Sequence, residues 1–126
     1  MTLLVTIPGL PPRECSPNAR VHWTVKMRSS RGWASSAFYC AVDARNRSRE
    51  PSKWRNLDNA QVSVTFVLPN NRRRDIDNLI SAFKSGLDSL VRCGILRDDD
   101  FKHVELSYKA VVGTEAMTLV EVSGEA

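Results

Sequence analysis

Alternating apolar and polar residues, or short apolar runs bounded by turn residues, mark four stretches of the chain as β-strands. We expect these strands at residues 3–7, 60–68, 104–112 and 116–122. The second stretch alternates most clearly, because it places Val62, Val64 and Phe66 on one face. Gly113-Thr114-Glu115 is a turn signal between the last two stretches, so we predict that they pair as a β-hairpin.

Two longer stretches repeat their apolar residues at intervals of three and four, which indicates amphipathic helices. In the first, at residues 22–45, the apolar stripe consists of Ala34, Ala37, Phe38, Ala41 and Val42. Gly32 and the serine pairs near it disfavour helix, so we expect this helix to start late or to bend. In the second, at residues 77–93, the stripe consists of Leu79, Ile80, Phe83, Leu87, Leu90 and Val91. Gly94 is the expected C-cap of this helix.

The expected elements follow the order β-α-β-α-β-β, which predicts an α/β (α+β) fold with a four-stranded mixed sheet and two helices. The chain has 126 residues, the size of one ordinary domain, so we treat residues 1–126 as a single domain. Four prolines exclude regular structure from residues 8–20, and residues 46–59 form a polar connector.

Composition narrows the class of protein only a little. Apolar residues make up 42% and charged residues 25% of the chain, which excludes wholesale disorder. The formal net charge is +4 and the pI is near 9.3, a basic excess that favours a polyanionic partner.

The cysteines and histidines do not form a zinc motif. Cys15, Cys40 and Cys93 lie far apart, and His22 and His103 are isolated, so we expect free thiols in a reducing compartment. The first residues lack the pattern of a signal peptide, and no apolar run approaches the roughly 20 residues that span a bilayer. We therefore expect a cytosolic protein without a membrane segment.

The clearest candidate chemistry lies at the start of the second helix. Asp75 and Asp77 are two residues apart, so both carboxylates can point to one place, as a partial cage for Mg²⁺ requires. Asn78 adds a neutral oxygen or a hydrogen-bond donor. Alternatively, Asp75 caps the helix and Asp77 complements its dipole.

Charged residues on both sides of this helix extend the pattern. Arg72, Arg73 and Arg74 precede the two carboxylates and form a candidate phosphate clamp, although such a run also suits a solvated loop. Asp98–Asp100 follow the helix as a second acidic cluster, which suits either a cation or an exposed turn. A helix over 77–93 is about 25 Å long, so the chain must double back for the clusters to meet.

Together these motifs resemble the RusA family of Holliday-junction resolvases, small homodimeric Mg²⁺-dependent endonucleases that are mostly derived from phages. The resemblance covers nearly the whole chain and is weakest over residues 45–60. It rests on the segments RRRDIDNL, LDSL, GILRDDD and SPNARVHW, which lie at residues 72–79, 87–90, 94–100 and 16–23.

The resemblance implies that Asp75, Asp77 and Asp99 hold the metal, with Asp98 and Asp100 as alternatives to Asp99. Ser81 stands where better-known members carry a catalytic lysine. Lys84, one turn further along the same helix face, is then the candidate to hold the scissile phosphate, or it is a surface lysine.

The same resemblance, with the exposure expected of the Pro-rich loop, makes Asn18 and Arg20 candidate DNA contacts, beside Arg72–Arg74 and Lys84. His22 and Trp23 are a candidate catalytic histidine and a candidate base-stacking aromatic, or they anchor their loop on the core.

The function expected from this resemblance is a homodimer that binds four-way DNA junctions and nicks two strands symmetrically, in recombination, repair or phage DNA processing. The alternatives are a non-catalytic nucleic-acid-binding module, an inactive phage homologue, or a metal nuclease for flaps or single strands.

Overall fold

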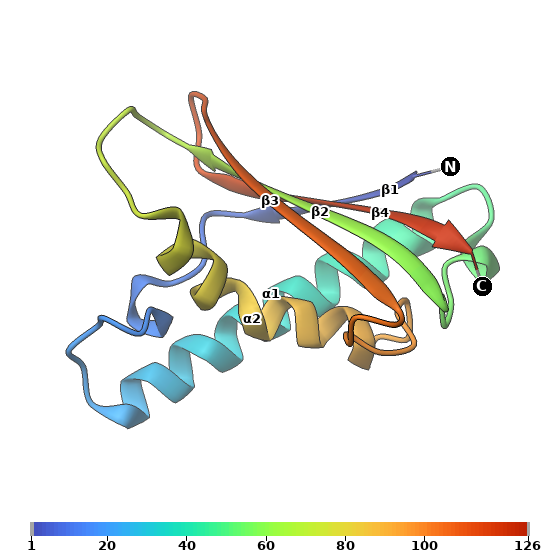
Figure 1. The fold of residues 1–126 in the computed structure, drawn as a ribbon, viewed down its shortest axis with the longest axis horizontal. Coiled ribbons are helices and arrows are strands. Elements are labelled where there is room, and N and C mark those ends of the chain that lie inside the picture. Colours follow the sequence, from blue (N-terminus) through green and yellow to red (C-terminus); the bar gives the residue numbers. More distant parts are fainter. Residues whose placement is uncertain (1, 126) are drawn as a thin grey trace.

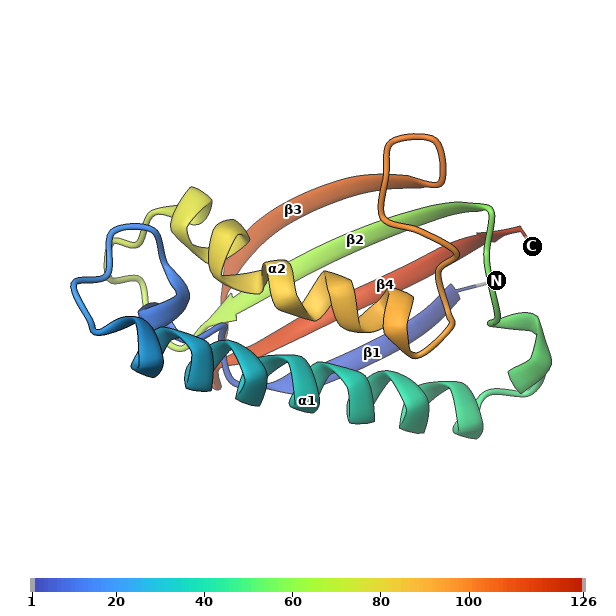
Figure 2. The same cartoon turned by 90° about the horizontal axis from the view of Figure 1, so that it is seen from below.

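The computed structural model describes residues 2–125, which form two layers (Figures 1 and 2). One layer is a sheet of four strands: β1 (Thr2–Pro8), β2 (Asn59–Leu68), β3 (Val104–Val112) and β4 (Met117–Glu125). The other layer is made of α1 (Trp23–Arg47) and α2 (Ile76–Arg92), which cover the same face of the sheet (Figure 2). The element order and the mixed sheet confirm the predicted fold class. Within the described residues, neither helix combines the length and apolar character that a membrane crossing requires.

The strands lie in the order β1-β4-β2-β3. β4 runs antiparallel to both of its neighbours, whereas β3 runs parallel to β2. The predicted hairpin between residues 104–112 and 116–122 is therefore wrong, because these consecutive strands lie on opposite sides of β2. Their connection crosses the end of β2, where the backbone N–H of Gly113 donates to the carbonyl of Leu68 at 2.8 Å.

Burial along the two strands accounts for this arrangement. β4 buries Thr118, Val120 and Val122 on the side of the helices, as suits an inner strand. β3 buries only Val104 and exposes most of its other residues, as suits an edge strand. α2 connects β2 to β3 as a β-α-β crossover, the connection that parallel neighbours need. Alternation in a strand determines which face each residue takes, but not which strand lies beside it.

The core lies between the sheet and the two helices, with Phe83 of α2 at its centre. The ring centroid of Phe83 lies 6.2 Å from that of Phe66 on β2 and 6.3 Å from those of Trp33 and Tyr108. The three alternating residues of β2 that were predicted to share a face are all fully buried here. The hydrophobic pattern of β2 and α2 thus identified the two main contributors to the core.

α1 begins at Trp23 and continues without a break through Gly32, so the prediction of a late start is wrong. The cost of a helical glycine is only about 1 kcal/mol. Burial of Trp33, Ala37 and Ala41 against the sheet and α2 outweighs this cost, since packing of one face supplies most of the stability of a helix in a protein.

The two helices run in the same direction, so their first turns lie at one end of the molecule (Figure 2). The hydroxyls of Ser85 and Ser89 on α2 each donate to a backbone carbonyl 55 positions earlier, on α1. The same offset places Trp23, the first residue of α1, level with Asn78 in the first turn of α2. Both positive helix ends therefore point toward the same region.

The connector at residues 46–59 contributes to the core, which its polar composition did not indicate. Trp54 and Leu57 are buried there. Their segment also holds the chain that follows α2, because the N–H groups of Asn56 and Leu57 donate to the carbonyls of Gly94 (2.7 Å) and Ile95 (2.9 Å). These contacts direct the chain back along α2 after the helix ends.

Candidate functional site

Asp75 and Asp77 lie at the start of α2 with exposed carboxylates. Asp75 occupies the N-cap position, but its side chain makes no capping hydrogen bond. Its nearest cation is Arg73, with 4.0 Å between Nη2 and the Asp75 carboxylate. Asp77 lies in the first turn and accepts a hydrogen bond from the backbone N–H of Asn78 at 3.1 Å. Asp75 therefore does not act as a side-chain cap here, and its oxygens are accessible to a cation.

The three arginines before α2 lie on an irregular loop that Asn70 organises. The Asn70 side-chain oxygen accepts from the backbone N–H of Arg72 (3.1 Å) and from Nη1 of Arg74 (3.2 Å). Arg72 and Arg73 are exposed, and Arg74 is half-buried. None of the three is buried with a carboxylate, so their charges are available to an external anion.

A groove of about 970 Å³ separates this loop from the Pro-rich segment that precedes α1. Four guanidinium groups line it: those of Arg13, Arg20, Arg72 and Arg74. Its acidic lining residues are Glu14 and Asp75. The walls come from segments far apart in sequence, and the groove carries more positive than negative charge.

A hydrogen bond joins the two walls of the groove. The side-chain amide of Asn18 donates to the side-chain oxygen of Asn78 at 3.1 Å. The structure thus brings Asn18 and Arg20 to the same groove as Arg72 and Asp75, as expected if these residues serve one ligand. Arg13 is a lining residue that sequence reasoning missed, since nothing in its local pattern sets it apart from other surface arginines.

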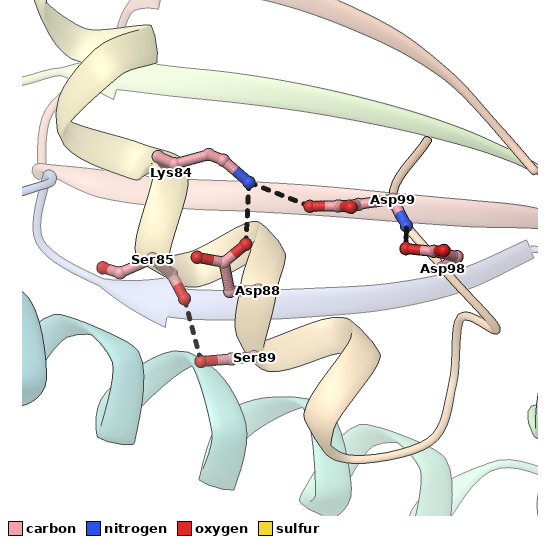
Figure 3. Close-up of polar contacts among 6 residues, drawn as sticks. All are labelled: Lys84, Ser85, Asp88, Ser89, Asp98 and Asp99. Atoms are coloured by element: carbon pink, nitrogen blue, oxygen red, sulfur yellow. Dashed lines mark hydrogen bonds and ion pairs between the residues drawn. The ribbon is translucent and has the colours of Figure 1, made fainter. Parts of the chain in front are cut away.

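Lys84 and Asp99 form the second part of the candidate site (Figure 3). Lys84 Nζ lies 2.7 Å from a carboxylate oxygen of Asp88, one turn later on α2, and 2.8 Å from one of Asp99. These bonds, to Asp88 first and then to Asp99, raise the pKa of the Lys84 ammonium. The bond from Lys84 likewise lowers the pKa of the Asp99 carboxyl. Lys84 is therefore an ion-paired lysine, and its i,i+4 spacing to Asp88 was the signal for this missed partner.

Of the three consecutive aspartates after α2, Asp99 points away from the other two. Asp99 is directed to Lys84, whereas ligand atoms of Asp98, Asp100 and His103 lie within 4.8 Å of one another. A hydrogen bond from His103 lowers the pKa of Asp100. Contact with α2 therefore distinguishes Asp99 from its two neighbours, which the sequence could not do.

The chain after α2 doubles back, but only part of the way. Asp99 reaches Lys84, which is seven residues beyond Asp77 and hence about 10 Å along the helix. Within residues 2–125, Asp75, Asp77 and Asp99 do not form a group of ligand atoms within 4.8 Å of one another. The assignment of these three carboxylates to one metal site stays a prediction.

His22 and Trp23 do not anchor their segment to the core. Both are exposed, and their rings contact each other at a centroid distance of 5.7 Å. His22 Nδ1 accepts a hydrogen bond from the backbone N–H of Thr24 at 3.2 Å, so this ring caps α1. The exposed ring of Trp23 is left without such a structural role.

In comparisons with known proteins, the chain matches no protein-family model and no curated protein.

Proposed function

We propose that this protein is a Mg²⁺-dependent endonuclease that binds branched DNA, with the four-way junction as its substrate. The observation that supports this most is the basic groove, because its walls come from two segments, far apart in the sequence, that each carry candidate DNA contacts. A polyanion entering the groove meets Arg20 and Arg72 on opposite sides. The carboxylate of Asp75 lies on the same wall as Arg72.

The donor chemistry at the start of α2 fits Mg²⁺. Asp75 and Asp77 offer hard carboxylate oxygens, and Asp75 makes no capping bond that would compete. These two residues would hold the ion; the resemblance adds Asp99 as a third ligand, although Asp99 is paired here with Lys84. When bound, the ion supplies a metal-activated water and stabilises developing negative charge.

The other residues of the site act on the phosphate backbone. Arg72–Arg74 and Arg20 bind phosphates through charge-assisted hydrogen bonds, while Asn18 fixes one wall against the other. Lys84 carries a positive charge at physiological pH, as lysines ordinarily do, and its two carboxylate partners raise its pKa further. We assign it to neutralising the scissile phosphate, the role that Ser81 cannot take.

We further propose that the protein acts as a homodimer, since two symmetric sites can nick a symmetric junction at equivalent points. Cys15, Cys40 and Cys93 are free, which agrees with the cytosol of a bacterial or phage-infected cell. Recombination, repair or phage DNA processing is the corresponding biological setting.

Two observations favour a second candidate, a non-catalytic module that binds nucleic acid through the same groove. The three proposed metal ligands do not converge, and Ser81 replaces a lysine that the resemblance calls for. A binding module of this kind should bind junction DNA without cutting it. Its affinity for the junction should not change when Asp77 is replaced by a neutral residue.

The test is cleavage of a labelled four-way junction and of a linear duplex of matched sequence, in Mg²⁺ and in EDTA. We expect Mg²⁺-dependent cutting of the junction, reduced to the EDTA level by Asp77→Asn. Asp43→Asn is the matched control, because Asp43 is an exposed aspartate on α1 that pairs with Arg47, away from the groove lining. Junction binding without cutting supports the module, and equal cutting of the duplex refutes junction selectivity.

Lys84→Ala tests the second part of the site in the same assay. Loss of a preorganised cation at the reacting phosphate typically lowers the rate roughly 100- to 1000-fold. The variant should remain folded, since exposed ion pairs contribute only about 0.2–1 kcal/mol each. Full cleavage activity in a folded Lys84→Ala protein would remove Lys84 from the mechanism.

A further inference from the structure

The first two turns of α1 carry an exposed aromatic and apolar surface on a strongly basic stretch. Trp23 is 63% exposed, and Met27, one turn later on the same face, is exposed as well. The stretch 15–42 contains no aspartate or glutamate, while it carries four basic residues: Arg20, Lys26, Arg28 and Arg31. A large exposed aromatic ring among basic residues suits a partner that is both flat and anionic.

This surface is continuous with the candidate site. Met27 and Lys26 line a depression of about 330 Å³ between the helices, whose other wall includes Ser81, Lys84 and one acidic residue, Asp88. On the other side, Arg20 and Val21 line the basic groove and directly precede the turn that begins α1. Trp23 lies in the sequence between residues that line the arginine groove and residues that line the Lys84 depression, and α1 begins at the end of the molecule where α2 also begins (Figure 2).

We infer that Trp23 is a stacking platform for an unpaired DNA base, next to the strand whose phosphates the groove and Lys84 hold. The inference rests on the proposed function, because it supposes that DNA lies in the groove. Bases have flat π-faces that stack on exposed aromatic side chains regardless of sequence. In a closed duplex both faces of each base are already stacked, so the platform selects branched, frayed or single-stranded DNA.

The position of Trp23 suits this role. As the first residue of α1 it projects toward the helix N-terminus, since helical side chains tilt that way. The first turn of α1 itself contains no acidic residue, and the acidic groups at this end include Asp75 and Asp77 of α2, the proposed metal ligands. His22 caps the helix and lies beside the Trp23 ring, with 5.7 Å between the ring centroids.

Trp23 can be observed directly, because it is the one exposed tryptophan among residues 2–125. Trp33 and Trp54 are 5% and 3% exposed, respectively. In EDTA, which prevents cutting, we expect a short oligothymidylate and a four-way junction to quench the exposed tryptophan emission. A blunt linear duplex should quench it much less.

Variants measure the contribution of the ring to affinity. For a fluorescently labelled oligothymidylate, Trp23→Ala should weaken binding roughly 5- to 140-fold, the usual effect of removing one stacking ring. Trp23→Phe should retain most of the affinity. Tyr39→Ala is the matched control and should change nothing, since Tyr39 is 71% exposed on the same helix but about 24 Å away along it.

The outcomes separate this inference from the nuclease proposal. Quenching that persists in a protein unable to cut DNA in Mg²⁺ supports the platform and refutes the nuclease. Junction cutting without quenching, or with unchanged affinity in Trp23→Ala, refutes the platform alone. If Trp23→Ala changes only the oligomeric state, measured by sedimentation, the surface is a contact between copies and the inference is overturned.

Discussion

Gly86 on α2 faces α1 and lies next to two aromatic residues of the core, Trp33 and Phe83. A Cβ atom added there would lie 3.0 Å from Nε1 of Trp33 and 3.0 Å from Cε1 of Phe83. Both rings are buried and pack edge to face, with centroids 6.3 Å apart, so neither can move aside freely. We predict that Gly86→Ala destabilises the protein although alanine favours helix.

Two opposing terms set the size of this effect. Replacing glycine by alanine inside a helix contributes about 1 kcal/mol of stability. Crowding a well-packed core typically costs about 1–3 kcal/mol. The net expectation for Gly86→Ala is a loss of about 1 kcal/mol in the free energy of unfolding.

Gly32 on α1 supplies the matched control, because a Cβ added there meets nothing within 4 Å. Gly32→Ala should therefore stabilise by about 1 kcal/mol. Both variants make the same change in helix propensity, so the difference between them isolates the crowding at Gly86. Urea unfolding at equilibrium measures both. If Gly86→Ala gains as much stability as Gly32→Ala, the helices do not approach each other as described.

Two further predictions concern the end of α2. Arg45 is buried and its Nη1 donates to the carbonyl of Cys93 at 2.7 Å, so Arg45→Ala should cost about 1.5–3 kcal/mol in urea unfolding. Arg47→Ala, which removes only an exposed pair with Asp43, should cost under about 0.5 kcal/mol. Equal losses in the two variants would contradict a stabilising contribution from the bond between Arg45 and Cys93. Burial raises the pKa of the Cys93 thiol above its ordinary 9.0, so less thiolate is present at pH 8 than in unfolded chains. Alkylation of Cys93 should be slower in the folded protein and should accelerate with rising pH, and faster labelling when folded would refute this.

The sequence predicted the elements of this fold because each depends on local periodicity. The strand at 60–68 and the helix at 77–93 appear within one residue of their expected ends. The strand partners were not predictable in this way. Alternation in 104–112 and 116–122 is equally compatible with a hairpin and with strands on either side of β2. Burial across the whole sheet decided between these arrangements.

The features of the candidate site likewise divide into those that the sequence predicts and those that depend on the fold. Adjacent residues, such as Asp75 and Asp77, were recognisable from spacing alone. The bond between Asn18 and Asn78 was not, since it joins two polar side chains 60 residues apart on irregular segments. Choosing Asp99 among the three aspartates likewise required knowledge of the path of the chain after α2. Leu57 in the connector holds that path, because its backbone N–H donates to the carbonyl of Ile95.

The place of β4 in the sheet has a consequence for how the chain assembles. Although β4 is an inner strand, it is the last of the four to leave the ribosome, and Thr2 of β1 pairs with Ser123 near its end. β2, α2 and β3 can associate early, but β1 has no strand partner until β4 has been made. Such long-range closure slows folding. A nascent or shortened chain lacking β4 therefore presents unpaired edges on both β1 and β2, which makes it prone to aggregation.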